Sequence, residues 1–252
     1  MILKLFSRRW ILTTLLVLVG VGVLARLGIW QLDRLEARRA FNARVSAQQT
    51  APLLVLDPAA LNDPSLAESL KGMEYRAVIV EGEYDFSHQV ALRNQSWGNE
   101  WGVHLLTPLR IAGSEQSILV DRGWIPAEAF KSGDWSAYDE LGRVTVQGIV
   151  RASQSKPDFG KKNDPEGVLQ AWNFANVERI QAQTPYALLP VYIQQAPDPA
   201  WTALPYRSLP EVELTEGPHM GYALQWFSFA ALLGVGYPFF IRKQSGAKHA
   251  QP

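Results

Sequence analysis

Two long apolar runs, one near each end of the chain, constrain this sequence more than any other feature. Trp10 to Leu32 is apolar apart from Arg26, Gln31 and a few neutral polar residues, and Met220 to Ile241 contains no charged residue. As helices, these runs of 23 and 22 residues extend about 34 and about 33 Å, which is enough to cross the hydrocarbon core of a bilayer. The sequence therefore predicts a membrane protein with two transmembrane α-helices.

The first apolar run also has a simpler interpretation. A short basic segment precedes an apolar stretch that ends near Ala25, which is the pattern of a cleaved signal peptide. A permanent anchor is favoured, because Trp10 to Ala25 already holds 16 residues and apolar character resumes at Leu27.

Charge is segregated along the chain although the formal net charge is zero. Residues 33–218 hold all 24 Asp and Glu but only 17 of the 24 Lys and Arg, so this segment carries −7 and the two ends together carry +7. Glutamates precede the second run, while Arg242, Lys243 and Lys248 follow it, so the positive-inside rule places the C-terminus in the cytoplasm. The acidic middle disfavours nucleic acid as a partner.

These observations predict a two-pass membrane protein with both termini cytoplasmic and its main domain on the outer face. The expected organisation is a cytoplasmic N-terminus (1–9), a transmembrane helix (10–32), an outer-face strand-rich domain (33–218), a second transmembrane helix (219–241) and a cytoplasmic tail (242–252).

Between the two runs, short β-branched and aromatic segments alternate with breaks rich in Gly, Ser and Lys. This pattern is typical of strands in a mainly β domain of the α+β kind, an antiparallel sandwich or a small barrel. Seven strands are predicted, at Tyr75–Tyr84, Gln89–Gln95, Gly102–Ile111, Ser117–Pro126, Arg143–Ala152, Leu169–Phe174 and Leu189–Gln195.

The composition and motifs argue against several chemistries. The chain has no cysteine, which excludes disulfides, zinc–thiolate sites and iron–sulfur clusters. The sequence contains no phosphate-binding loop, no nucleophile elbow and no His-Glu-x-x-His, so an enzyme is disfavoured and no catalytic residue is assigned. His88 and His104 have no second ligand at metal spacing, and a surface or core position with satisfied hydrogen bonds is expected for each.

His219 stands at the mouth of the second apolar run, directly after Gly217-Pro218. An imidazole at this position can ligate iron or can lie among lipid headgroups. Helical spacing places it on one face with Tyr222 or Ala223, then Trp226 and Ala230. The same aromatic residues are also expected of an ordinary interfacial belt.

On the first run, Arg26, Trp30 and Arg34 recur at intervals of four residues and line one helix face. Arg26 lies near the end of the run, so it can extend its side chain to the outer interface. A sharper hypothesis is that Arg26 and Arg34 meet an acidic group of a bound cofactor, while His219 approaches from the neighbouring helix at the same depth.

Three segments resemble the motifs of one family, the Surfeit locus protein 1 family. Residues 27–35 (LGIWQLDRL) resemble its Gly-x-Trp-Gln-x-x-Arg signature, residues 118–126 (ILVDRGWIP) its Val-x-Arg-Gly-Trp-x-Pro motif, and residues 219–227 (HMGYALQWF) its His-x-x-Tyr-Ala-x-x-Trp-Phe motif. Asp121 stands where many members have Asn, and a local pair with Arg122 is expected. Gly123 is expected to permit a turn or bulge, Trp124 to be buried and Pro126 to end the strand.

The resemblance implies a cytochrome c oxidase biogenesis factor of the bacterial plasma (inner) membrane that assists insertion or transfer of haem a into the catalytic oxidase subunit. It also implies cytochrome c oxidase subunit I and other oxidase or haem a synthesis proteins as partners, beside the lipid bilayer. His219 then becomes the candidate ligand of the haem iron, with Arg26, Trp30, Arg34, Tyr222 and Trp226 as cofactor-binding candidates. The alternative is a haem-independent membrane scaffold that stabilises an oxidase assembly intermediate.

Overall fold

The computed structural model describes residues 7–157 and 162–247. The start of the expected N-terminal segment (1–6) and the end of the expected tail (248–252) lie outside the described residues. The chain divides into two compact units: one is formed by the residues up to Arg44 together with those from Glu213 onward, and the other runs from Val45 to Val212.

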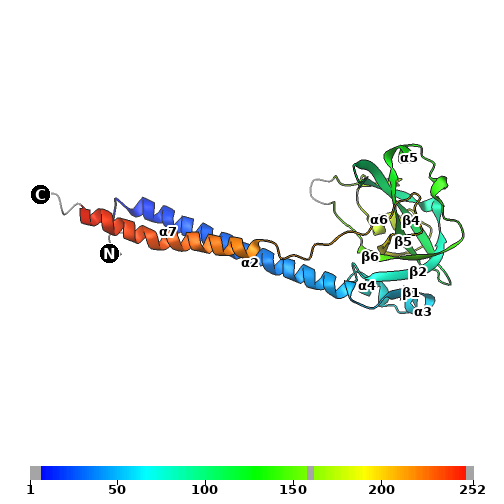
Figure 1. Cartoon of the computed structure of the whole chain (residues 1–252), viewed down its shortest axis with the longest axis horizontal. Helices are drawn as coiled ribbons and strands as arrows, with labels where there is room; N and C mark the ends of the chain where they lie inside the picture. The colour runs from blue at the N-terminus through cyan, green and yellow to red at the C-terminus, as the bar shows by residue number, and fades with distance from the viewer. Residues whose placement is uncertain (1–6, 158–161, 248–252) are drawn as a thin grey trace. The chain divides into compact units, whose positions relative to one another are not determined.

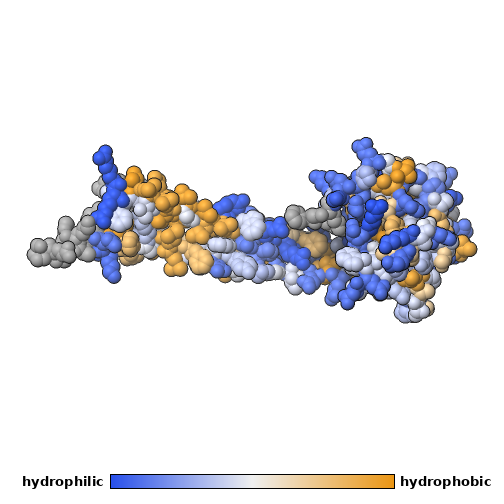
Figure 2. All heavy atoms as spheres, turned by 90° about the horizontal axis from the view of Figure 1, so that it is seen from above, coloured by the Kyte–Doolittle hydropathy of each residue, from blue (hydrophilic) through white to orange (hydrophobic). Residues whose placement is uncertain are grey.

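The first unit is an antiparallel pair of long helices, α2 (Ile11–Gln49) and α7 (His219–Ala247), which lie side by side (Figure 1). Each is long and apolar enough to cross a membrane, and only 11% of the most apolar window of each is buried within the chain. A core helix of a soluble protein would bury most of that surface, whereas a lipid-facing helix exposes it. Figure 2 shows hydrophobic side chains gathered along one stretch of the paired helices. The prediction of two apolar membrane helices is confirmed.

Both helices continue beyond the apolar runs. α2 extends from Leu32 through a charged segment to Gln49, because this segment is rich in helix-forming residues and contains no Gly or Pro before Pro52. α7 likewise extends past Ile241 to Ala247. The helix that was expected to end at residue 32 is thus much longer than a bilayer requires.

The two helices meet along a heptad seam that periodicity reasoning on the apolar runs did not reveal. Among the buried or half-buried residues of each helix, one set recurs at alternating steps of three and four, which is the pattern of left-handed helix pairs. On α2 these a and d positions are Thr14, Val17, Val21, Leu24, Gly28, Gln31, Leu35, Arg38 and Asn42; on α7 they are His219, Ala223, Trp226, Ala230, Leu233 and Tyr237.

The second unit is a mixed β-sheet that closes into a small barrel (Figure 1). The strand order is β1-β2-β6-β8-β5-β4-β3-β7, and an additional β2–β4 pairing closes β2, β6, β8, β5 and β4 on themselves. The described strands are β1 (Leu54–Leu56), β2 (Ala77–Tyr84), β3 (Val90–Trp97), β4 (Glu100–Ile111), β5 (Ser117–Pro126), β6 (Arg143–Ala152), β7 (Ala171–Trp172) and β8 (Leu188–Gln195).

The prediction of a mainly β domain is confirmed. Of the two predicted architectures, a sandwich and a small barrel, the structure is the barrel. All seven predicted strands are present, although β7 is only two residues long, and the three-residue β1 was missed because so short a run has no visible alternation. The expectation of purely antiparallel pairing is wrong for β1–β2, β3–β7 and β5–β8, which are parallel.

Short helices surround the barrel: α3 (Pro58–Leu61), α4 (Leu66–Leu70), α5 (Ala127–Lys131) and α6 (Val177–Gln181), with single 3-10 turns at Phe86–His88 and Ser136–Tyr138. Alternate residues of the five barrel strands point inward and form one apolar cluster, which Leu61 of α3 and Leu70 of α4 join. A second cluster on the outer face of β5 and β8 packs beneath α6. Successive residues of β5 therefore face opposite clusters, Val120 inward and Leu119 outward.

Candidate functional site

His219 is the first residue of α7, and its side chain reaches across to α2. Its Nδ1 lies 2.8 Å from Oε1 of Gln31, and both residues are half-buried. Gly217 precedes it in the left-handed region, at a φ of 69°, which turns the chain into the helix. Among the described residues, Nε2 of His219 has no hydrogen-bond partner. The imidazole is thus held by one nitrogen and open at the other.

The rest of the predicted α7 face is only partly as expected. Ala223 and Ala230 are buried in the seam, and Trp226 is half-buried beside them. Tyr222 is 48% exposed, so Ala223, and not Tyr222, shares the seam face of α7 with His219. Tyr222 occupies a g position, which flanks the seam.

Arg26, Trp30 and Arg34 are all exposed side chains on α2. Arg26 occupies an f position, opposite the seam, and its Nη1 lies 3.7 Å from Oδ2 of Asp33. Arg34 occupies a g position, and no ion pair or hydrogen bond joins it to another described residue. In an antiparallel pair the g positions of both helices flank one side of the seam. The fold therefore brings His219, Arg34 and Tyr222 to a common side and leaves Arg26 on the opposite side of α2.

A polar clasp, formed by Arg38, Arg39, Asn42 and residues 213–216, continues the helix pair beyond its apolar part. Arg38 donates to the carbonyl oxygens of Thr215 at 3.0 Å and Glu213 at 2.5 Å. Arg39 forms two 2.8 Å hydrogen bonds with the Glu216 carboxylate. Asn42 donates to Leu214 and Thr215. These α2 residues escaped notice because they lie outside the apolar run, although the heptad spacing extends through Arg38 and Asn42.

The central motif lies on β5, where Arg122 is completely buried inside one end of the barrel. Its guanidinium lies over the rings of Tyr84 and Phe86, at 4.9 and 5.0 Å from their centroids. It donates to Gln89 Oε1 at 3.0 Å, to the carbonyl oxygen of Tyr138 and to Glu140 Oε1 at 3.1 Å. The arrangement neutralises a buried charge and fastens the 138–140 segment to the barrel.

Two neighbouring groups complete this end of the barrel. Arg207 donates to the same Glu140 oxygen at 2.6 Å and stacks on Trp201. Burial raises the pKa of Tyr84, so its hydroxyl stays protonated and donates to Gln195 Oε1 at 3.3 Å. A single carboxylate thus ties two almost fully buried arginines, Arg122 and Arg207, together.

The expected pair between Asp121 and Arg122 is wrong. Adjacent strand residues point to opposite faces, so Arg122 faces the barrel interior and Asp121 faces outward. Asp121 instead lies 2.8 Å from Nδ1 of His104 and accepts the backbone N–H of Gly123 at 3.0 Å. Burial lowers the pKa of His104, but the charge and hydrogen bond of Asp121 outweigh it and raise the pKa above its ordinary value.

Both histidines of the barrel unit are satisfied, as predicted: His104 pairs with Asp121, and His88 pairs with Asp85 at 3.0 Å. Within the described residues, no group of three or more His, Asp or Glu side chains is arranged to hold a metal ion. Neither histidine is therefore placed as a metal ligand.

The remaining motif residues have packing roles, as expected. Gly123 has a φ of 116°, and a Cβ at this position would overlap the carbonyl group of Tyr206. Trp124 is 1% exposed and stacks on Tyr206, which also packs against Trp97. Pro126 ends β5. The motif therefore anchors the segment that leads back to the second helix.

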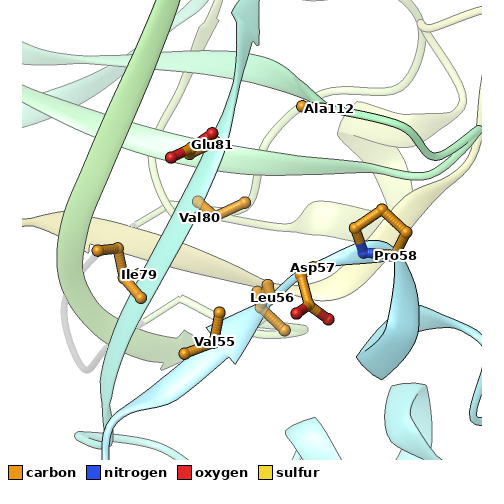
Figure 3. Close-up of a pocket in the computed structure, with 8 residues that line it drawn as sticks. All are labelled: Val55, Leu56, Asp57, Pro58, Ile79, Val80, Glu81 and Ala112. Carbon is orange, nitrogen blue, oxygen red and sulfur yellow. The ribbon is translucent and has the colours of Figure 1, made fainter.

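One pocket of the barrel unit, about 300 Å³ in volume, lies where β1 leaves β2 (Figure 3). Its lining is mostly apolar, with Val55 and Ile79 on one side and Pro58 and Ala112 on the other, as the close-up shows. Asp57 and Glu81 are its only ionisable residues, and the Asp57 carboxylate already accepts the N–H of Ala60. Because no imidazole lines it, this pocket offers no nitrogen ligand for haem iron.

The fold and the helix pair define a two-span membrane protein that carries a small β-barrel domain between its spans. Residues 18–231 match the SURF1 family, and the chain belongs to that family. It is similar to the SURF1-like protein of Monosiga brevicollis, with 27% identity over 90% of this chain and 87% of that protein. It is also similar to Surfeit locus protein 1 of Rattus norvegicus, with 25% identity over 87% of this chain and 73% of that protein. The SURF1-like protein of Rickettsia felis is 26% identical over 91% of this chain and 97% of that protein.

Proposed function

We propose that this protein assists the biogenesis of a cytochrome c oxidase, at the step at which haem a is inserted into or transferred to the catalytic subunit. Membership of the SURF1 family supports the role in oxidase assembly. The haem step rests on one observation, the His219 imidazole at the end of the helix pair with Nδ1 bonded and Nε2 open. A ligating histidine whose other ring nitrogen is hydrogen-bonded is the usual arrangement at metal centres.

The residues around His219 fit a haem. The imidazole would supply a nitrogen ligand for the iron, and Arg34, which forms no ion pair with another described residue, would supply a cation for a propionate through a charge-assisted hydrogen bond. Trp226 and Tyr222 add aromatic surface on and beside the seam. Arg26 at its f position and Trp30, which occupies a c position and is 46% exposed, both lie off the seam, so we assign them to the lipid interface. A single iron ligand gives moderate affinity, which suits a carrier that must release its cargo.

We propose that the protein spans the plasma membrane twice, with both termini in the cytoplasm and the barrel on the outer face. There the barrel would dock on oxidase subunit I or on haem a synthesis proteins. Fusing alkaline phosphatase, which is active only outside the cytoplasm, to the C-terminus and separately into the loop after Lys131 tests this arrangement. Activity is expected only from the internal fusion, and activity of the C-terminal fusion would contradict the topology.

The haem step is tested by purifying the protein in detergent from a host that makes haem a. The wild type is expected to show a bound-haem absorption spectrum, and His219→Ala to lose it. His88→Asn, which changes a histidine of the barrel unit, serves as the control and should keep the spectrum. A colourless wild type that still co-purifies with oxidase subunit I would support the haem-independent scaffold instead.

A further inference from the structure

The contact between His219 and Gln31 determines which ring nitrogen carries the proton. An amide oxygen only accepts hydrogen bonds, so at 2.8 Å from Gln31 Oε1 the Nδ1 of His219 must be the donor. A neutral imidazole has a single N–H, so Nε2 is left with its lone pair. Without a partner at Nδ1, a histidine side chain in solution prefers the opposite tautomer, with the proton on Nε2.

The surroundings of Gln31 hold this arrangement in place. Gln31 occupies a seam position between Gly28, which is in contact with Phe227, and Leu35, which is 3% exposed. Its side chain is therefore directed at α7 and not at the lipid. In an apolar environment a hydrogen bond is stronger than in water, and an unpaired polar group is more costly.

We propose that Gln31 is a positioning residue, which fixes His219 as the Nδ1-protonated tautomer and presents the Nε2 lone pair for ligation. The identity of the ligand, the iron of a haem, rests on the proposed function, whereas the tautomer does not. Gln31 thus acts on the iron only through His219.

The tautomer can be read without any haem. The full-length protein, labelled with ¹⁵N-histidine and reconstituted in lipid vesicles, is examined by solid-state NMR at a pH at which imidazole is neutral. His219 is identified by the signals lost in His219→Ala. The wild type is expected to show an Nδ1–H and a bare Nε2, and a predominant Nε2–H in the wild type would overturn the inference.

Two variants of Gln31 separate positioning from packing. Gln31→Met keeps the side-chain length but removes the acceptor, and is expected to convert most of His219 to the Nε2–H form. Gln31→Glu retains an acceptor oxygen and is expected to keep the Nδ1–H form. An unchanged tautomer in Gln31→Met would contradict the proposal.

A disulfide reports whether the helices remain paired in these variants. The chain has no cysteine, and a Cβ at Gly234 would lie 3.6 Å from Val21 Cγ2, so Val21→Cys with Gly234→Cys provides one cross-link far from His219. Equal cross-linking in the wild-type and Gln31→Met backgrounds shows that the seam is intact. If Gln31→Met abolishes the cross-link, the wild-type spectrum and Gln31→Glu still decide the question.

Haemin titration of the same samples, followed by absorbance, tests the link to the proposed function. We expect Gln31→Met to bind haemin about 10- to 100-fold more weakly than the wild type, the usual effect of losing such a partner, and Gln31→Glu to retain binding. A wild type with the Nδ1–H tautomer that binds no haemin would refute the haem step and leave the positioning role standing. A wild type that carries the Nε2–H tautomer and still binds haemin would refute the positioning role and leave the haem step standing.

Discussion

Phe227 of α7 packs its ring directly over Gly28 of α2. A Cβ at residue 28 would lie 2.6 Å from Cε1 of that ring and 2.7 Å from Cζ, closer than any real contact allows. Phe227, which lies next to the seam residue Trp226, thus fills the space that Gly28 leaves on α2. Glycine is needed at this position for close packing, as in other membrane helix pairs.

Gly28→Ala should therefore weaken the pairing of α2 and α7. Overpacking of this kind costs about 1–3 kcal/mol in a well-packed core. The Val21→Cys, Gly234→Cys cross-link measures the effect, and its yield in vesicles should fall in Gly28→Ala. Gly22→Ala is the matched control, because nothing lies within 4 Å of a Cβ at that position. Equal cross-link yields in Gly28→Ala and Gly22→Ala would show that the close contact between Gly28 and Phe227 does not control the pairing of the two helices.

Removal of Arg122 should destabilise the barrel unit strongly. The side chain is fully buried, and its loss leaves Glu140 beside Arg207 alone and empties the space between Tyr84 and Phe86. Breaking a buried ion pair from one side costs about 3–5 kcal/mol. Urea unfolding of the full chain in detergent, followed by tryptophan fluorescence, should show this loss for Arg122→Met. The exposed Arg143→Met on β6 should change the midpoint little.

The His104–Asp121 pair should make the stability of the barrel depend on pH. Because Asp121 raises the pKa of His104 in the folded state, the stabilisation is complete below the ordinary histidine pKa of about 6.5 and is lost as pH rises through the raised value. The urea midpoint should thus fall with increasing pH above about 6.5. His104→Asn should remove that part of the dependence, and a variant curve parallel to the wild-type curve would exclude this pair as its cause.

The polar clasp should protect residues 213–216 from proteolysis. Its bonds are exposed and therefore weak, so local opening should respond more than global unfolding. Cleavage by a Glu-specific protease at Glu213 and Glu216 should be several-fold faster in Arg38→Gln than in the wild type. Arg44→Gln, an exposed change on the same helix with no contact to this segment, should cleave at the wild-type rate.

Much of the barrel could be predicted from local pattern. Alternation along Ala77–Tyr84 and the β-branched, aromatic run Ser117–Pro126 are local properties of the strands, so the strands could be predicted nearly to their ends. Which strands pair, and in which direction, depends on contacts between distant segments. The parallel β5–β8 pairing and the closure of β2 on β4 were therefore beyond reach.

The candidate site divides in the same way. The apolar run located His219 at the start of α7, because hydrophobicity and helical spacing are local properties. The partner of its Nδ1 depends on how α2 and α7 are aligned, because Gln31 and His219 lie 188 residues apart in sequence. The sequence marks Gln31 only as a polar residue within the first apolar run. The pairing of Asp121 with His104, and of Arg122 with Glu140, likewise required the orientation of β5 within the barrel.

Two bilayer-length apolar helices, a strand-rich domain between them and three motifs of one family can all be read from the amino-acid sequence, because hydrophobicity, alternation and short motifs are encoded within neighbouring residues. The folded structure was needed to show that the helices share a heptad seam, that Gly28 receives Phe227, that His219 is held by Gln31, and that Arg122 lies inside the barrel. Each of these depends on the packing of segments distant in sequence, where the shape and polarity of one surface select their complement on another.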